Sequence, residues 1–457
     1  MEKEGKIYTV GTLRYNMARL LIVCFWVLWG IFWYDMIQYI LVPTLMPLNF
    51  KALGASGEWM GVVLGSLPAL ANFFLNPIIS TASDRTRTKM GRRMPFMLWS
   101  IPFVTFFGLL LGWLPLFRSS IASFFPSVNG NYLMLVLYSV VFLCFYIAGL
   151  LIGIISCYLA PDVIPGEFIG RFQVAKGLVA TAAGFIFNMF LLKYAETHAQ
   201  WLYTGIAALF AISFTGLCLF VKEGEYPPPE VPDNDLPWHK RTMENFRTYF
   251  KDCFSKPFYL LLFLGFALTN VSTSCRGMFN ILFATRDLNL STEQYGEIMA
   301  YGKIVSLGVL AVMMFCIDRF NALLLYFFTG VIVLLLNIWG YFWAVDYNSF
   351  LVIGLVLVLI YTMQSLASTP MLILLLPKEK YGQFCSAAMM ITCICSVIGS
   401  WLAGKVVDIW GYRFIYVWDF VFTLAASVFL IMVYLRWKKI KAAESKSVSD
   451  SPQNMKG

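Results

Sequence analysis

The chain has 457 residues, of which 59% are hydrophobic and only 13% are charged, and its mean hydropathy is +0.72. A soluble domain carries about twice that share of charged residues, so the composition excludes an ordinary soluble protein and indicates a polytopic membrane protein. The net charge of +9 would suit a nucleic-acid partner only if the cations gathered on one soluble surface.

Twelve apolar segments follow one another along the chain, and each is long enough to cross a bilayer as a helix. The first is longer than the apolar core of a signal peptide, so we expect it to be retained in the mature protein. The predicted spans lie near residues 20–47, 57–82, 95–117, 131–160, 170–193, 200–221, 257–284, 294–317, 321–345, 349–376, 382–407 and 413–436.

Lysine and arginine are concentrated in the loops on one side of these spans. The densest loop is 83–95, SDRTRTKMGRRMP, and both chain ends fall on the same side. The positive-inside rule therefore places both termini in the cytoplasm, and we expect a multi-pass protein of the plasma (cell inner) membrane. This distribution accounts for the net charge as a solvated basic face, so we expect the lipid bilayer and no nucleic acid as a partner.

A long connection divides the spans into six and six. It is first acidic and proline-rich and then basic, and apolar residues recur at helical spacing in 239–254. This pattern is typical of an amphipathic helix on the membrane surface, although a plain linker helix fits as well. We predict a helical bundle over 1–221, a cytoplasmic linker over 222–256, a second bundle over 257–436 and a disordered tail over 437–457.

The two halves repeat. LGASGEWMG at 53–61 and LNLSTEQYG at 288–296 share Leu, Ser, Glu and Gly at a fixed offset of 235 residues (288 minus 53), and PGEFIGRF at 165–172 matches PKEKYGQF at 377–384. Asp84-Arg85 and Asp318-Arg319 lie at nearly the same offset. The repeats predict an all-α membrane protein of two pseudo-symmetric six-helix bundles, the organisation of transporters that alternate access.

This pattern resembles the major facilitator superfamily. The loop SDRTRTKMGRRMPF, with its stretched spacing from Asp84 to Gly91, is similar to that of the glycoside-pentoside-hexuronide symporters and the sucrose-type sugar carriers. Ser80 stands where the superfamily has its opening glycine. The resemblance implies a cytoplasmic gate built from Asp84, Arg85, Gly91, Arg92, Arg93, Asp162, Arg171, Asp318 and Arg319.

The gate also has a physical rationale. Asp84, at the inner end of its span, would accept hydrogen bonds from a neighbouring helix N-terminus, and the arginines would pair with carboxylates of the other half. Such contacts form only when the cytoplasmic side is shut, so they would bias the equilibrium between access states.

The resemblance also bears on the coupling ion. In melibiose-type symporters two carboxylates, four residues apart and before a proline, bind sodium; this chain has Asn72 and Asn76 before Pro77, and Gly153 where a third carboxylate is expected. Neutral amides attract a cation far less than carboxylates do. We therefore expect a proton rather than sodium as the coupling ion, with no metal and no cofactor.

Charged residues at bilayer depth are costly and usually functional. Asp35 lies on the helix face opposite Trp26, Trp29 and Trp33, so we expect it to bind substrate or a proton, with a structural ion pair as the alternative. Arg276 falls at a similar depth, and we predict that the two pair across the cavity; Lys303 is the other candidate partner. We expect Lys176, nearer the inner face, to reach the membrane surface or a loop carboxylate.

Sugar recognition would also need amides and hydroxyls, although helix–helix hydrogen bonds use the same residue types. The predicted substrate and proton site comprises Asp35, Gln38, Asn72, Gln173, Asn270, Arg276, Asn280, Tyr301, Lys303 and Gln364.

We predict a monomeric secondary transporter that moves a sugar or glycoside by alternating access as a proton symporter. A facilitator or exporter of another amphiphile or lipid, and a non-transporting sensor, are the alternatives. The chain has only two histidines, both in loops, and no HExxH motif, so we expect no enzymatic activity.

Overall fold

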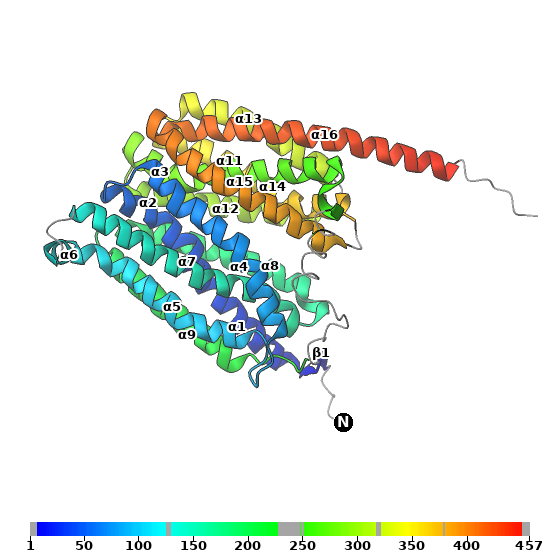
Figure 1. Cartoon of the computed structure of the whole chain (residues 1–457), viewed down its shortest axis with the longest axis horizontal. Coiled ribbons are helices and arrows are strands. Elements are labelled where there is room, and N and C mark those ends of the chain that lie inside the picture. The colour runs from blue at the N-terminus through cyan, green and yellow to red at the C-terminus, as the bar shows by residue number, and fades with distance from the viewer. Residues whose placement is uncertain are drawn as a thin grey trace, which may run out of the picture. The chain divides into compact units, whose positions relative to one another are not determined.

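The computed structural model describes residues 7–124, 129–226, 247, 251–316, 321–377 and 380–449. Within these residues 12 helical segments are long and apolar enough to cross a membrane, and Figure 1 shows them in chain order from blue to red. The predicted all-α fold and its twelve spans are confirmed. The predicted helix over 239–254 lies largely outside the described residues, as do Asp318 and Arg319 of the predicted gate.

A short hairpin of β1 (Tyr8–Val10) and β2 (Leu13–Tyr15) precedes the spans. The first six spans comprise α1 (Met17–Asp35), η1 (Met36–Leu41) and α2 (Val42–Ala52); α3 (Gly57–Gly61), η2 (Val62–Ser66) and α4 (Leu67–Arg85); α5 (Met94–Trp113), η3 (Leu114–Phe117) and α6 (Arg118–Phe124); α7 (Gly130–Val163); α8 (Gly166–Ile186), η4 (Phe187–Leu191) and η5 (Leu192–Tyr194); and α9 (Ala199–Phe220).

The last six spans comprise α11 (Pro257–Leu282) with η6 (Phe283–Asp287), α12 (Thr292–Cys316), α13 (Ala322–Trp343), α14 (Tyr347–Leu375), α15 (Tyr381–Trp410), and η9 (Tyr412–Phe414) with α16 (Ile415–Ser449). The residues from 437 onward were predicted to be a disordered tail, and this is wrong as far as Ser449. The helix continues because Trp437 packs beside Tyr434 against the core, with Lys441 Nζ 4.6 Å from the centre of its ring.

Two spans widen into π-helix just before a proline. The segment η1 precedes Pro43 and η2 precedes Pro68. A proline has no N–H to donate and its ring displaces the carbonyl one turn earlier, which shifts the hydrogen-bond ladder of the preceding turn. Asp35 is the last residue of α1 before this widened turn, so its carboxylate sits where the helix is locally irregular.

The chain packs as two compact units. The first is drawn from Met1–Pro232, Gly277–Leu307 and Ser400–Tyr412, and the second from the intervening segments Asp233–Arg276, Gly308–Gly399 and Arg413–Gly457. In the first unit α5 packs against α7 and α9, and α1 packs against α8 and α9. In the second, α13 packs against α14 and α16. The boundaries predicted for the two bundles and the linker stay predictions.

Candidate functional site

Asp35 is the centre of a charged group in the first unit. It lies in the middle of the span Met17–Ala52, is partly buried, and interacts electrostatically with Lys176 of α8 and Lys303 of α12. Three spans therefore contribute charges to one neighbourhood. Lys303 was predicted as a site residue and as a candidate partner of Asp35, and the two charges interact. Lys176 was expected to reach the membrane surface or a loop carboxylate; it also interacts electrostatically with Asp35, and its expected position stays a prediction.

The stem of Lys303 lies against the backbone of α8. A Cβ atom added at Gly184 would be 2.7 Å from Lys303 Cε and 3.4 Å from its Nζ. Further along, a Cβ atom at Gly296 of α12 would be 2.3 Å from the carbonyl oxygen of Asn188 in η4, which continues α8. Glycines on both helices therefore allow α8 and α12 to approach closely, and this places the ammonium of Lys303 on the surface of α8.

Next to Asp35, η1 packs tightly on α7. The Tyr34 hydroxyl donates to the carbonyl oxygen of Gly149 at 2.9 Å, and a Cβ atom at Gly149 would be 2.3 Å from Gln38 Oε1. Gln38 is 6% exposed, and its Oε1 has no hydrogen-bond donor among the described residues. A buried acceptor without a donor is costly, so this oxygen suits a ligand hydroxyl or a water molecule.

The positions that match the sodium site of melibiose-type symporters are filled differently here. Asn76 Nδ2 donates to Asn72 Oδ1 at 3.3 Å, so the two amides bond to each other. A Cβ atom at Gly153 would be 2.4 Å from the Tyr34 hydroxyl, which leaves no room for a longer side chain. The residues present therefore do not provide the carboxylate set of that site.

The other predicted polar residues fall in different surroundings. In the first unit Asn280 Oδ1 is buried without a donor among the described residues, whereas Gln173 and Tyr301 are exposed. In the second unit Asn270 donates to the carbonyl of Phe266 in its own helix, at 2.9 Å, and Gln364 is buried. Of this set, Gln38 and Asn280 have an amide oxygen that lacks a donor within the described part of the chain.

Arg276 belongs to a separate, closed cluster in the second unit. Its Nη2 and Nε donate to Asp419 Oδ2 at 3.1 and 3.2 Å, and its Nη2 also donates to Asn337 Oδ1 at 2.7 Å. Asp419 is completely buried and accepts further hydrogen bonds from the hydroxyls of Tyr361 and Ser272. The predicted pairing of Arg276 with Asp35 is corrected here, because the guanidinium is occupied by a carboxylate of its own unit.

Asp419 was not predicted from the sequence, although a depth argument would have found it. At 1.5 Å per residue, Asp419 lies about 9 Å and Arg276 about 12 Å from the outer ends of their predicted spans. The two residues are therefore at matching depths, on spans that a compact bundle can bring together.

The arginines of the loop 83–95 form an ionic network at the predicted cytoplasmic side. Arg92 binds Asp162 with two nitrogens, at 2.8 and 3.2 Å, and Arg93 contacts Asp84 at 2.6 Å and Asp162 at 3.2 Å. Burial opposes the charge of Arg92, but its hydrogen bond to Asp162 and the charge of that carboxylate raise the pKa of Arg92 above its ordinary value. These pairs lie within one unit, whereas carboxylates of the other half were predicted as partners.

Glu223 caps the helix that follows this loop. Its carboxylate accepts from the backbone N–H groups of Arg92, Arg93 and Met94 at 2.9, 2.8 and 2.7 Å, at the start of α5. Gly91 has φ of +108°, and a Cβ atom there would be 2.6 Å from the Glu223 side chain, so glycine is required. A helix N-terminus was predicted to bind Asp84; the carboxylate found at the start of α5 is that of Glu223.

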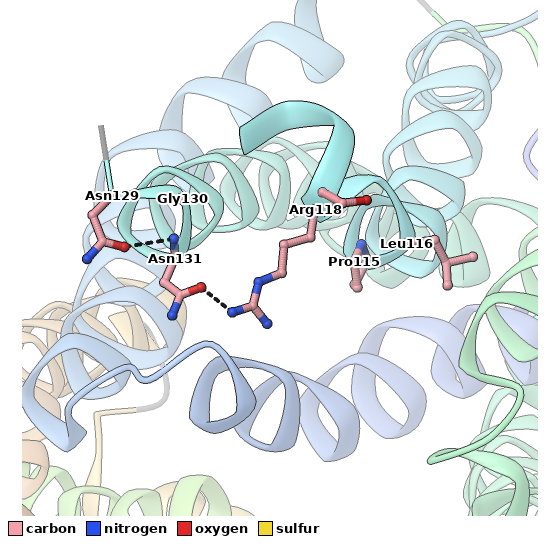
Figure 2. Close-up of a pocket in the computed structure, with 7 residues that line it drawn as sticks. Pro115, Leu116, Arg118, Asn129, Gly130 and Asn131 are labelled. Carbon is pink, nitrogen blue, oxygen red and sulfur yellow. Dashed lines mark hydrogen bonds between the residues drawn. The ribbon is translucent and has the colours of Figure 1, made fainter. Parts of the chain in front are cut away.

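The first unit also contains the predicted gate residue Arg171 and a surface pocket near the ends of two spans. Arg171, a predicted gate residue, lies over the ring of Phe168 at 5.8 Å. Figure 2 shows a surface pocket at the ends of α6 and α7, where Arg118 donates to Asn131 Oδ1; it is lined by Pro115, Leu116, Arg118, Ser119, Asn129, Gly130 and Asn131. Because it lies at span ends, we do not assign this pocket to the transport path.

Comparison with solved structures shows the fold. A bacterial homolog of the human lysosomal transporter Spinster, in an inward-facing and occupied conformation, has a TM-score of 0.65 and 13% identity, with 91% of this chain and 96% of that chain covered. The nucleoside transporter NupG has a TM-score of 0.60 and 15% identity, with 92% and 100% covered. A D-xylose-proton symporter has a TM-score of 0.58 and 15% identity, with 90% and 96% covered.

Comparison of the sequence with known proteins identifies the family. The general alpha-glucoside permease of Schizosaccharomyces pombe (strain 972 / ATCC 24843) is 38% identical over 64 residues, which are 14% of this chain and only 11% of the permease. The family model for MFS/sugar transport proteins matches residues 8–433, nearly the whole chain, and the predicted membership of the major facilitator superfamily is confirmed. The chain therefore belongs to the MFS/sugar transport protein family, and it is a multi-pass membrane transporter and not an enzyme.

Proposed function

We propose that the protein carries a sugar or glycoside across the membrane in symport with a proton that binds Asp35. The observation that supports this most strongly is the open charged group around Asp35. This mid-span carboxylate faces Lys176 and Lys303 but has no direct ion pair among the described residues, whereas Asp419 is fully paired. A carboxylate in that situation is suited to gain and lose a proton during a cycle.

Protonation of Asp35 would change the electrostatic attraction between charges on three spans. The ionised carboxylate attracts both ammonium groups and so favours the arrangement in which α1, α8 and α12 are close. A proton on Asp35 removes that attraction, and the equilibrium between access states shifts by the difference in interaction energy. Substrate that binds only one protonation state then couples its own movement to that of the proton.

Sugar recognition is supported by the buried amide oxygens and by the family. The oxygens of Gln38 and Asn280 lack donors within the described part of the chain, and sugar hydroxyls are donors of the right kind. The family model describes sugar transport, and the matched segment of the alpha-glucoside permease adds to it. We further propose that the carrier works as a monomer in the plasma membrane with both termini in the cytoplasm, without sodium or another cofactor.

Uptake into proteoliposomes tests this function. We expect a radiolabelled α-glucoside such as maltose to accumulate when a pH gradient, acidic outside, is imposed, and not when the gradient is collapsed. Asp35→Asn should abolish gradient-driven accumulation while leaving sugar binding. Asp252→Asn, which neutralises an exposed carboxylate paired with Lys380 at 2.6 Å, is the matched control and should leave accumulation unchanged.

Two results would contradict the proposal. Equilibration that ignores the pH gradient would identify a facilitator instead of a symporter. Accumulation by Asp35→Asn at the rate of the unmodified protein would remove Asp35 from the coupling mechanism.

A further inference from the structure

We propose that Asp408 is a latch, a contact that holds the membrane face opposite to the loop 83–95 shut, and that only one of two repeat-related seams has it. A seam here is the packed surface between a span of the first six and a span of the last six, and both seams lie within the first unit. The span Gly57–Arg85 ends in the loop 83–95, so its start lies at the opposite face. This inference adds a positioning residue for transport and does not depend on the solute or the coupling ion.

Asp408, two residues before the end of α15, caps the first turn of α3. Its Oδ1 accepts from the backbone N–H of Gly57 at 2.6 Å, and its Oδ2 accepts from that of Glu58 at 2.8 Å. The next N–H, that of Trp59, donates to Ser56 Oγ at 3.1 Å. The first N–H groups of a helix have no partner in their own helix, and the positive end of the helix favours a carboxylate. The start of the second span is therefore completed only while the end of α15 is docked on it.

Small residues bring these two spans close enough for the cap. Gly57 and Gly61 are four residues apart on the first of them. Ser400, Gly404 and Asp408 have the same spacing on the second. A Cβ atom at Gly61 would be 2.2 Å from the carbonyl oxygen of Ser400, and a Cβ atom at Gly404 would be 2.0 Å from that of Gly57. The backbones thus touch along one face of each helix, and Asp408 lies at the end of this contact.

A second side-chain hydrogen bond joins the same two span ends. Trp401 Nε1 of α15 donates to Glu58 Oε1 at 2.7 Å. The cap and this bond both connect a span of the first six to a span of the last six. Alternating access requires these two sets of spans to separate at each membrane face in turn. Opening of this face must break both bonds, so they stabilise the state in which it is shut.

The repeat of the two halves provides an internal comparison. The offset of 235 residues takes Gly61 to Gly296, and the offset of 212 residues between the two later motifs (377 minus 165) takes Ser400 to Asn188. These counterparts also meet, because a Cβ atom at Gly296 would be 2.3 Å from the carbonyl oxygen of Asn188. The seam between η4 and α12 therefore repeats the packing of the seam between α3 and α15.

The cap of the first seam is not repeated in the second. The offset of 212 residues takes Asp408 to Glu196, which is exposed, and no hydrogen bond between described residues joins Glu196 to α12. The start of α12 is capped locally: the N–H of Ser291 donates to Gln294 Oε1 at 3.0 Å, and the N–H of Gln294 donates to Ser291 Oγ at 3.1 Å. Such a capping box needs nothing from another span. Similar packing with different caps assigns the latch to Asp408.

Side-specific labelling of a buried cysteine in the full-length protein tests the latch. Met278 lies behind the first seam, because its Sδ would be 3.2 Å from a Cβ atom at Gly65, and it is 9% exposed. Met278→Cys is the reporter. A membrane-impermeant maleimide is added to intact cells or to inverted membrane vesicles, whichever preparation allows labelling of Ser119→Cys, an exposed position at the same membrane face. Mass spectrometry reads each cysteine separately, so the native cysteines do not interfere.

Three variants are compared on the Met278→Cys background. Asp408→Asn loses the charge and one of the two acceptor oxygens, so we expect the labelling rate of the reporter to rise about three- to tenfold. Glu196→Gln, at the repeat-related position, is the matched control and should leave the rate within about 1.5-fold. Trp401→Phe keeps an aromatic ring but removes the indole donor, and it should raise the rate about twofold.

Two outcomes would overturn the latch directly. The first is labelling in Asp408→Asn at the rate of the unmodified background. The second is an equal rise in Glu196→Gln, since the loss of any acidic side chain at this face would then be sufficient. Native Cys218, buried in α9, is read in the same samples and should stay unlabelled in every variant. If its labelling rises in parallel with that of the reporter, Asp408 is a contact needed for folding and not a latch.

Discussion

Two charged groups within the spans of this protein differ in how completely their members are paired. In the second unit Arg276 and Asp419 form a neutral pair, and the carboxylate receives donors from several helices. In the first unit Asp35 interacts with two lysines, the sum of these three charges is positive, and Asp35 forms no direct ion pair with any described residue. The comparison teaches that a charge with a full set of ion-pair and hydrogen-bond partners is structural, whereas a charge without such a set is free to bind a ligand or a proton.

We expect the largest change in stability when the ion pair of Arg276 and Asp419 is broken. Asp419→Asn leaves the Arg276 guanidinium buried and uncompensated, so we expect the free energy of unfolding to fall by about 3–5 kcal/mol. Thermal unfolding of the purified protein in detergent measures this. Asp35→Asn, in the open group, should change the free energy of unfolding by less than about 1 kcal/mol, because Asp35 has no direct ion pair to lose.

A double variant checks the reason for that loss. Arg276→Met with Asp419→Leu removes both charges and fills similar volume, and well-packed apolar replacements of buried pairs are often neutral or stabilising. We therefore expect most of the stability lost in Asp419→Asn to return. A double variant as unstable as Asp419→Asn would show that packing, and not charge, explains the effect.

The spans were predictable from length and hydropathy, and the fold was predictable from the repeats between the two halves and from the family resemblance. The local structure within the spans was less predictable. The π-helical segments η1 and η2 precede Pro43 and Pro68, and the first span continues through Pro47 to Ala52, beyond its predicted end. Hydropathy contains no information on which helix face meets which neighbour. It could therefore nominate Asp35 and Arg276 by cost but could not assign their partners.

Two carboxylates with important contacts were missed for different reasons. Asp419 lies close to the predicted start of the last span and was therefore not counted among the residues at bilayer depth. Glu223 lies three residues after the end of α9, in an acidic, proline-rich sequence, and we therefore placed it in the linker. Its carboxylate instead accepts hydrogen bonds from three N–H groups at the start of α5. Both depend on contacts between residues far apart in sequence, which a single sequence does not show.

Asn337 supports the ion pair of Arg276 and Asp419. Asn337 is buried and accepts from Arg276 Nη2 at 2.7 Å, so Asn337→Ala leaves a charged donor unsatisfied and should lower the free energy of unfolding by about 1–3 kcal/mol. Asn270→Ala is the matched control, because within the described part of the chain the amide of Asn270 donates only to the carbonyl of Phe266 in its own helix. If the two variants lose equal stability in thermal unfolding, the cluster around Arg276 is less cooperative than its contacts indicate.

Glu223 is a charged residue outside the spans whose hydrogen-bond partners are also complete, and we expect a smaller effect there. Glu223→Gln keeps an acceptor but removes the charge at the N-terminus of α5, which should cost about 1 kcal/mol and less at high salt. Glu225→Gln is the control, since the contact of Glu225 with Thr12 uses its backbone N–H. Thermal unfolding at low and high salt measures both, and a loss that salt does not reduce would contradict an electrostatic origin.

The smallest expected effect has the opposite sign. Lys176→Met removes a cation from a group that already has one in excess, so we expect no loss of stability and a gain of up to about 1 kcal/mol, measured by thermal unfolding. The same substitution at Arg276, which breaks a neutral pair, should destabilise. If Lys176→Met were to destabilise by several kcal/mol, Lys176 would be a structural partner of Asp35. The first-unit group would then be a closed cluster like that of Arg276 and Asp419.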